Sequence, residues 1–289
     1  MQTICFVILH FKDNQVTDTC VQSILNMDQQ DRIKIVIVDN DIQKSDKERA
    51  ALSAKYEKIS NIEILKIKEN GGFSYANNQG YQYARQKLKA SYIVVINNDI
   101  EFTQRDFVAR LENSYEEHPC QVLGPDIIRR GTGEHQNPMD TRVRTAEEAR
   151  YTIRMNHFAM RFYPVMYPVV YYMLKRAEKK KMADMEKQVA LSSCVRENIV
   201  PFGACLIFTP MFVEKEEKAF TPETQFFYEE YILTLRCQKK GYRIVYDPAM
   251  VVKHESGSAT KKSFGTEKKR IRFMMEKTAK SCEIYLKLL

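Results

Sequence analysis

Polar side chains close two of the apolar segments in the first half of the chain. Residues 36–38 (Val-Ile-Val) run directly into Asp39, and the apolar stretch ending at Ile96 runs into Asn97-Asn98-Asp99. A carboxylate at a strand end suits a ligand site better than a core, although a capped turn would explain either one alone. Open α/β sheets bind ligands at the carboxyl ends of their strands. We therefore expect both strand ends to face one binding site.

A glycine-rich turn followed by asparagines is a third candidate. Asn70-Gly71-Gly72 precedes a helical stretch that contains Asn77 and Asn78. Glycine permits a tight turn and a close approach of the backbone to a ligand. A strand–turn–helix cap would explain the glycines, but it would leave the repeated asparagines unexplained.

A regular alternation of strands and helices must position these residues. Residues 3–10 read as a continuous apolar strand of the kind buried on both faces, and residues 14–27 show helical spacing. The alternation continues with strands at 33–38, 62–67, 92–96 and 121–124 and helices at 45–58, from the glycine turn to 88, and 104–117. This spacing predicts an α/β fold with a Rossmann-like, mostly parallel sheet flanked by helices.

The second half of the chain departs from this pattern. Residues 131–197 are rich in Arg, Met and Tyr and predict a helical insertion. Regular structure returns with strands at 199–208, 242–246 and 251–254, a helix at 228–240 and a basic helix from 265. A chain of 289 residues fits one domain with an elaborate insertion. We divide it into 1–130, 131–197, 198–260 and 261–289.

The positive charge is concentrated in two places. The chain carries a net charge of +8, and residues 239–289 hold 13 Lys/Arg against 5 Asp/Glu, so the first 238 residues are neutral overall. Residues 141–190 hold 11 Lys/Arg against 5 Asp/Glu. Basic patches attract phosphate-bearing partners, although a solvated helix would explain the C-terminal charges equally well. The neutral first part and the lack of an aromatic-basic sheet motif argue against nucleic acid as a partner.

Cysteine usage and hydropathy predict a cytoplasmic protein. Seven cysteines, an odd number without a C-x-x-C pair, are typical of reduced core cysteines. The uncharged run Phe162–Leu174 has 13 residues, too few to span a bilayer. It lies between Arg161 and Lys175-Arg176, so it suits either peripheral contact with the inner membrane face or a buried core or oligomer contact.

Four segments, taken together, resemble family 2 of the inverting glycosyltransferases, which have the GT-A fold. The subgroup that looks closest contains rhamnosyltransferase-like and capsular polysaccharide synthesis enzymes. The resemblance covers residues 3–130 and 199–258. Its segments are Val36–Asn40 (V-V-D-N), Glu69–Gly80 (N-x-G-F-x-x-x-N-x-G), Val95–Asp99 (an N-x-D form of D-x-D) and Phe202–Cys205 with Phe226–Arg236 (F-x-G-A…F-F-Y-x-E-D).

The resemblance implies a UDP- or dTDP-linked sugar donor and a divalent metal, Mg²⁺ or Mn²⁺. It assigns Asp39 to the uracil or thymine base and Asp99 to the metal. His254, in a segment similar to the family's v-x-H-x-x-G-S ending, would help to hold the metal or the diphosphate. The implied donor-binding residues are His10, Phe11, Asp39, Asn70, Gly72, Asn77, Asn78, Asn97 and Asn98.

Glu230 stands at the position of the family's catalytic base, and the preceding Glu229 is the second catalytic candidate. One base opposite the leaving group implies inversion. The resemblance implies a saccharide or lipid-linked acceptor and a role in cell-surface polysaccharide synthesis. Ile232 replaces the family's second acid, so a degenerate, non-catalytic member is an alternative. A sugar nucleotidyltransferase is another, but residues 10–14 lack the glycine-rich phosphate loop that it needs.

Overall fold

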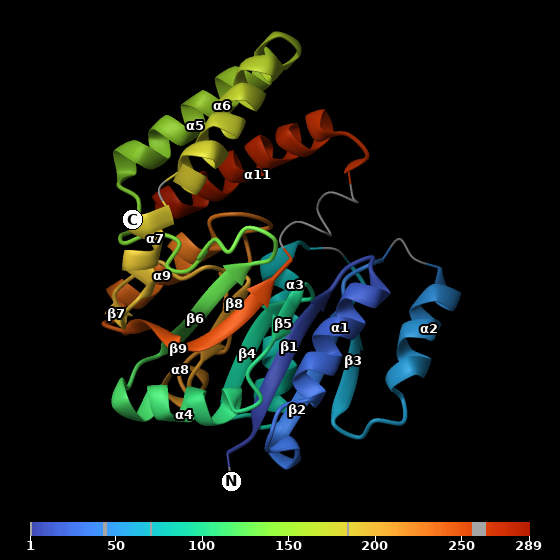
Figure 1. The fold of residues 1–289 in the computed structure, drawn as a ribbon. Coiled ribbons are helices and arrows are strands. Elements are labelled where there is room, and N and C mark those ends of the chain that lie inside the picture. The colour runs from blue at the N-terminus through green and yellow to red at the C-terminus, as the bar shows by residue number, and fades with distance from the viewer. Residues whose placement is uncertain (1, 43–44, 70, 184, 256–263) are drawn as a thin grey trace.

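Helices cover both faces of a mixed sheet (Figure 1) in the computed structural model, which describes residues 2–42, 45–69, 71–183, 185–255 and 264–289. The nine described strands run in the order β3-β2-β1-β4-β8-β6-β9-β5, with β7 paired to β9. They are β1 (Ile4–His10), β2 (Ile33–Asp39), β3 (Ile62–Lys66), β4 (Tyr92–Asn97), β5 (Ile100–Phe102), β6 (Val122–Arg129), β7 (Arg196–Glu197), β8 (Cys205–Phe208) and β9 (Ile244–His254).

The helices follow the predicted alternation in the first half and the predicted insertion in the second. They are α1 (Asn14–Leu25), α2 (Asp46–Tyr56), α3 (Phe73–Gln86), α4 (Phe107–Glu117), α5 (Ala146–Arg161), α6 (Tyr163–Ala183), α7 (Met185–Ser192), α8 (Pro210–Val213), α9 (Glu229–Lys239) and α11 (Glu267–Leu288), with a 3₁₀ turn η1 at Gln30–Arg32.

The first four strands in chain order are parallel and end at one edge of the sheet. In the ladder between β1 and β2, His10 is the partner of Asp39, and in the ladder between β1 and β4, Leu9 is the partner of Asn97. The two polar strand ends therefore lie on either side of the end of β1, as the sequence predicts. The predicted α/β fold is confirmed.

Antiparallel pairing begins at β8, which lies between β4 and β6. The sequence predicts separate strands at 242–246 and 251–254, and this is wrong, because β9 runs without a break from Ile244 to His254. Its register against β6 shifts between Pro125 and Asp126. A bulge of this kind lets one strand contain an irregular stretch while its pairing continues on both sides.

Strict alternation along the buried strands creates two hydrophobic layers. Ile4, Phe6 and Ile8 of β1 belong to the layer covered by α1, α2 and α4. Cys5 and Val7 belong to the layer covered by α3, α8 and α9. Burial of each large aliphatic side chain contributes about 1.5–3 kcal/mol, so both faces of the sheet hold the strand ends in place.

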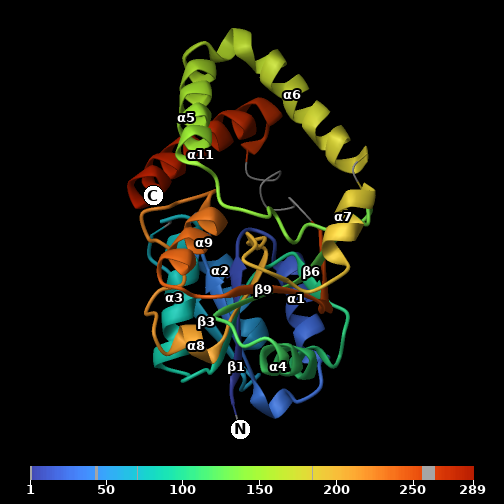
Figure 2. The same cartoon turned by 90° about the vertical axis from the view of Figure 1, so that its left-hand side faces the viewer.

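The insertion forms a separate helical layer near the carboxyl ends of β1, β2 and β4. The C-terminal helix α11 packs along α5 and also contacts α6 and α9. Figures 1 and 2 show α5 and α6 projecting beyond α11, away from the sheet. Within the described residues, no helix is long and apolar enough to cross a membrane. The division at 131, 198 and 261 stays a prediction.

Candidate active site

A buried acid–imidazole pair stands just after β4. Asp99 Oδ1 lies 3.2 Å from Nε2 of His254, at the end of β9, and only 7% and 6% of the two side chains are exposed. Nδ1 of His254 lies 2.7 Å from Oε1 of Gln136. Because an amide oxygen only accepts, Nδ1 carries the proton of this hydrogen bond. In the neutral ring, Nε2 then presents its lone pair toward Asp99.

This pair has the chemistry of half a metal site. Mn²⁺ accepts carboxylate oxygen, and imidazole nitrogen is a common transition-metal ligand. A metal-bound histidine usually donates its other N–H to a fixed acceptor, as His254 does to Gln136. Among the described residues, no group of three or more His, Cys, Asp or Glu side chains could hold a metal ion. A divalent ion bound here would take its remaining ligands from phosphate oxygens and water.

Two glutamates open α9, and one of them faces a glycine. Oε1 of Glu230 accepts the N–H of Gly203 at 3.2 Å. A Cβ at position 203 would lie 2.6 Å from the same oxygen, so glycine is what admits the carboxylate here. Burial raises the pKa of Glu230. Burial, followed by repulsion from the Glu230 carboxylate, raises the pKa of Glu229 to about 8.

The acid–imidazole pair and the glutamates meet at residues 202–204. The N–H of Asn97, two residues before Asp99, donates to the carbonyl of Ala204 at 3.0 Å. The ring of Phe202 lies 5.8 Å from the ring of His254, between centroids. The short segment that binds Glu230 is thus also in contact with the end of β4, two residues before Asp99, and with the ring of His254. The structure brings these three predicted residues into one site.

His10 and Asn98 converge on a hydroxyl. Nδ1 of His10 lies 2.6 Å from Oγ1 of Thr17, and Nδ2 of Asn98 donates to the same oxygen at 2.9 Å. All three side chains are buried. This network ties the ends of β1 and β4 to α1, which is a positioning role. The predicted donor contacts of His10, Asn98 and Asn97, and of the half-buried Phe11, stay predictions.

Asp39 is fully buried and already paired. Its Oδ2 accepts Nε–H of Arg49 at 2.8 Å, and its Oδ1 accepts the N–H of Asp41 at 3.2 Å. Arg49 also donates to the backbone carbonyls of Asp39 and Ile67. A carboxylate has about four acceptor positions, so these two bonds leave acceptor capacity for an N–H from a ligand.

The start of α3 is joined to the loop that leads to α9. Gly72 has a φ of 89°, and a Cβ there would lie 2.4 Å from the carbonyl oxygen of Gln225. The N–H of Phe73 donates to the same oxygen at 2.6 Å. Gly72 is therefore required by the backbone. Asn70, the other donor residue predicted in this turn, lies outside the described residues.

The two asparagines of α3 have different surroundings. The amide of Asn78 makes two 2.9 Å hydrogen bonds to the backbone of Phe220, one in each direction. It anchors α3 to the loop before α9. Asn77 is fully buried, and neither its amide oxygen nor its amide nitrogen has a hydrogen-bond partner in the part of the chain that the structure describes. A ligand contact stays the prediction for both.

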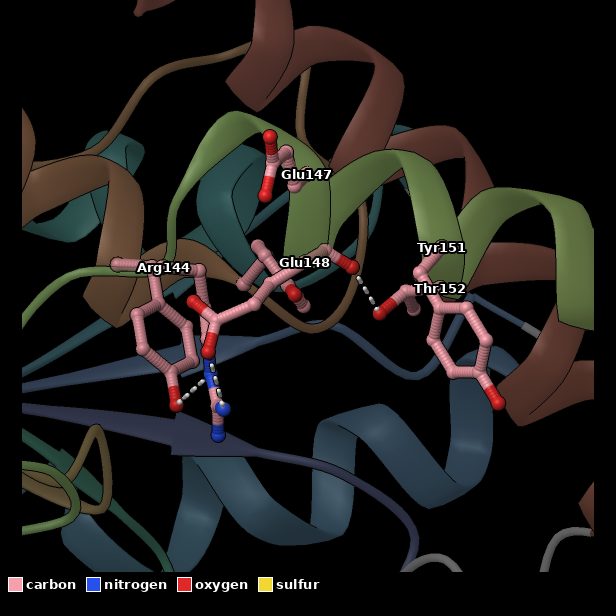
Figure 3. A pocket seen from close by; sticks show the side chains of 7 residues that line it. Arg144, Glu147, Glu148, Tyr151 and Thr152 are labelled. Atoms are coloured by element: carbon pink, nitrogen blue, oxygen red, sulfur yellow. Dashed lines mark hydrogen bonds and ion pairs between the residues drawn. The ribbon is translucent and has the colours of Figure 1, made fainter.

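A cavity of about 590 Å³ adjoins α9 (Figure 3). Tyr228 and Tyr231, which flank the two glutamates in sequence, form part of its wall. Nε of Arg144 donates to the hydroxyl of Tyr231 at 3.1 Å, and its guanidinium lies 5.4 Å from that ring's centroid. The remaining lining residues come from the first two turns of α5 and are Glu147, Glu148, Tyr151 and Thr152.

Comparison with known proteins decides the family. A family model described as "Glycosyl transferase family 2" matches residues 5–179. The chain belongs to this family. A comparison with curated protein sequences gives no match. The glycosyltransferase resemblance is thereby confirmed, while the subgroup within the family stays a prediction.

Solved glycosyltransferase structures share the fold at low identity. S. aureus TarS 1–349 is 12% identical with a TM-score of 0.53, and the match covers 88% of this chain and 60% of that one. Mannosyltransferase PcManGT from Pyrobaculum calidifontis, in complex with GDP-Man and Mn²⁺, is 14% identical with a TM-score of 0.54, and the match covers 98% of this chain and 69% of that one. GalNAc-T7 with UDP, GalNAc and Mn²⁺ is 13% identical with a TM-score of 0.55, and the match covers 88% of this chain and 44% of that one. This chain therefore spans less than two thirds of TarS 1–349 and of GalNAc-T7.

The sequence did not predict three residues that position the candidate site. Arg49 holds Asp39, Gln136 holds His254, and Thr17 joins His10 to Asn98. The sequence predicted the helices that contain Arg49 and Thr17, but not the contacts that these two side chains make. Gln136 lies in the segment after β6, for which the sequence offered no regular pattern.

The raised pKa of Glu229 predicts a pH-dependent stability. Between its ordinary value of 4.5 and about 8, the folded protein keeps a proton that the unfolded chain releases, so the free energy of unfolding falls as pH rises. Glu229→Gln removes this contribution. The stability of Glu229→Gln relative to wild type should therefore increase with pH across this range, as measured by urea denaturation. A difference that stays constant with pH would contradict the assignment.

Proposed function

We propose that this chain is an inverting glycosyltransferase that moves a sugar from a nucleoside-diphosphate donor, UDP- or dTDP-linked, to an acceptor hydroxyl. The observation that carries the proposal is the position of Glu230. Its carboxylate is partly buried, accepts the N–H of Gly203, and adjoins the segment that contacts the backbone of Asn97, two residues before Asp99, and the ring of His254. A base and a phosphate-side group thus meet at the carboxyl edge of the sheet.

Glu230 acts as the general base in this proposal. The acceptor oxygen gives its proton to the carboxylate and forms a bond to the anomeric carbon, while the bond from that carbon to the diphosphate oxygen breaks. The nucleoside diphosphate leaves with the bonding electrons, and a single displacement inverts the anomeric centre. Burial supports this role, because it raises the pKa of Glu230 toward neutral pH, where a general base works best.

Asp99 and His254 would hold the donor side. A divalent ion, Mg²⁺ or Mn²⁺, would neutralise negative charge on the diphosphate when bound to Asp99 and His254. Mn²⁺ in the PcManGT and GalNAc-T7 structures supports a metal on the same fold. Asp39, fixed by Arg49, would accept the imide N–H of uracil or thymine.

The acceptor would be a saccharide or a lipid-linked saccharide, bound toward the cavity beside α9. The faces of Tyr228 and Tyr231 and the charges of Arg144 and Glu147 suit a ring that carries hydroxyl groups. The four motif segments support a place in the rhamnosyltransferase-like or capsule-synthesis subgroup and a role in cell-surface polysaccharide synthesis. A cytoplasmic location remains part of the proposal.

Replacement of the base separates an enzyme from a binding protein. Glu230→Gln should lower kcat by about 10²-fold or more, the usual scale for a lost general base, and leave donor affinity nearly unchanged. Turnover is measured as released nucleoside diphosphate across a panel of nucleotide sugars, and donor affinity by thermal shift. Glu229→Gln should have a milder effect on kcat.

Glu223→Gln, an exposed neutralisation outside α9, is the matched control and should leave kcat unchanged. A larger loss in Glu229→Gln than in Glu230→Gln would transfer the base to Glu229. Donor binding by the wild type without turnover on any donor and acceptor tested would favour the non-catalytic alternative.

Replacement of Asp99, just after β4, tests the proposed metal site. Asp99→Asn should abolish the rise in melting temperature that Mn²⁺ adds to UDP binding, because one of the two proposed protein ligands is lost. EDTA should have the same effect on the wild type. Asp31→Asn, at the exposed η1 turn, serves as control. If Asp99→Asn keeps the full Mn²⁺-dependent shift, the metal does not bind there.

A further inference from the structure

The α5–α6 pair carries exposed apolar side chains that the fold does not use. Met155 and Phe158 of α5 recur at helical spacing with Phe162, the residue that caps the end of α5, and Val165, Val169 and Tyr172 do so on α6. Between 41% and 77% of each residue is exposed. We name these six residues the α5–α6 apolar face. A group of exposed apolar side chains such as this is typical of a surface that binds a protein or a membrane.

The same two helices have a different face for their own packing. Ala159 and Tyr163 are buried against Ile271 and Met275 of α11, with Met166 and Tyr167 packed at the edge. The hydroxyl of Tyr163 also donates to the carbonyl of Lys268 at 2.5 Å. The helices are therefore seated on α11 without the α5–α6 apolar face, so burial of that face requires something outside the described residues.

The charges around this face indicate which kind of partner binds it. Residues 150–180 contain seven Lys/Arg and one Asp/Glu. On α5, Arg154 and Arg161 each precede a member of the apolar face by one residue and border it. On α6, the line from Val165 through Tyr172 continues at helical spacing to Arg176 and Lys180. A second copy would bring the same positive charge against this one, whereas an anionic surface complements it.

We infer that the α5–α6 apolar face and its bordering cations form a docking site for the surface of an anionic lipid bilayer. Aromatic and aliphatic side chains beside Lys and Arg are the pattern of helices that lie in the headgroup region. Each cation near an anionic bilayer adds about 1 kcal/mol to binding, and this attraction is screened by salt. Figures 1 and 2 place these helices at the end of the molecule toward which β1 runs. Docking would therefore bring the candidate active site to the membrane side.

Vesicle cosedimentation of the full chain tests the inference. Binding should be strong to an equimolar mixture of phosphatidylcholine and phosphatidylglycerol at about 0.1 M salt. It should fall at least about tenfold at about 1 M salt, where the screening length drops from about 10 Å to about 3 Å, and on vesicles of phosphatidylcholine alone. The triple variant Val165→Ser, Val169→Ser, Tyr172→Ser should lose at least about tenfold in affinity.

Charge variants separate a specific site from general attraction. Arg154→Gln, Arg161→Gln, Arg176→Gln together should weaken binding to anionic vesicles by at least about tenfold. Lys58→Gln, Lys87→Gln, Lys218→Gln remove the same charge from exposed positions elsewhere and should bind like wild type. Equal loss in both triple variants would overturn the site. Thermal melts establish that each variant is folded.

Absence of vesicle binding by the wild type would overturn the inference. If sedimentation velocity then shows a dimer that the Val165→Ser, Val169→Ser, Tyr172→Ser variant loses, the face is a contact between copies. Release of nucleoside diphosphate in the absence of lipid is expected to be the same in all these variants. A failure of membrane docking is therefore distinguishable from a failure of the proposed catalytic function.

Discussion

The candidate site depends on a strained backbone just before α9. Phe227 and Tyr228 have φ values of 66° and 67°, a left-handed conformation that costs bulky residues about 1–3 kcal/mol each. Contacts with α11 hold it: the ring of Phe226 packs on Phe273, the ring of Tyr228 packs on Tyr285, and Ser281 donates to the carbonyl of Phe226. This turn comes directly before α9, whose Glu230 carboxylate accepts the N–H of Gly203. The C-terminal helix is thus part of the site's support.

The antiparallel strand β8 connects the two halves of the proposed chemistry. Parallel strands alone would bring only their carboxyl ends to the site, and these supply the end of β1, Asp39 and Asp99. Because β8 runs the opposite way between β4 and β6, its beginning lies at that same edge. The residues just before β8 therefore lie beside Asn97, and the N–H of Gly203 among them binds Glu230. The β4–β8 ladder therefore fixes the segment that binds Glu230 beside the end of β4.

The sequence predicted what local patterns encode. Apolar runs that end in Asp39 and Asn97 gave the strands and their shared edge, and helical spacing gave α1, α3 and α9 to within a few residues. Pairings between separate elements were not predictable from it: Arg49 of α2 binds Asp39 at the end of β2, and Gln136 binds His254, which is 118 residues away in the sequence. The uncharged run 162–174 showed a similar limit, because periodicity did not show that Tyr163 is buried while Val165 is exposed. Those facts depend on where α11 packs.

The buried amide of Asn77 on α3 affects the free energies of folding and of ligand binding. A buried amide without a partner costs about 1–3 kcal/mol, and Asn77 has none within the described residues for either of its amide atoms. The neighbouring Asn78 is fully bonded on the same helix, so the helix itself does not forbid satisfaction. An apolar residue at position 77 would avoid this cost. A ligand that hydrogen-bonds to this amide would therefore gain binding free energy by satisfying it.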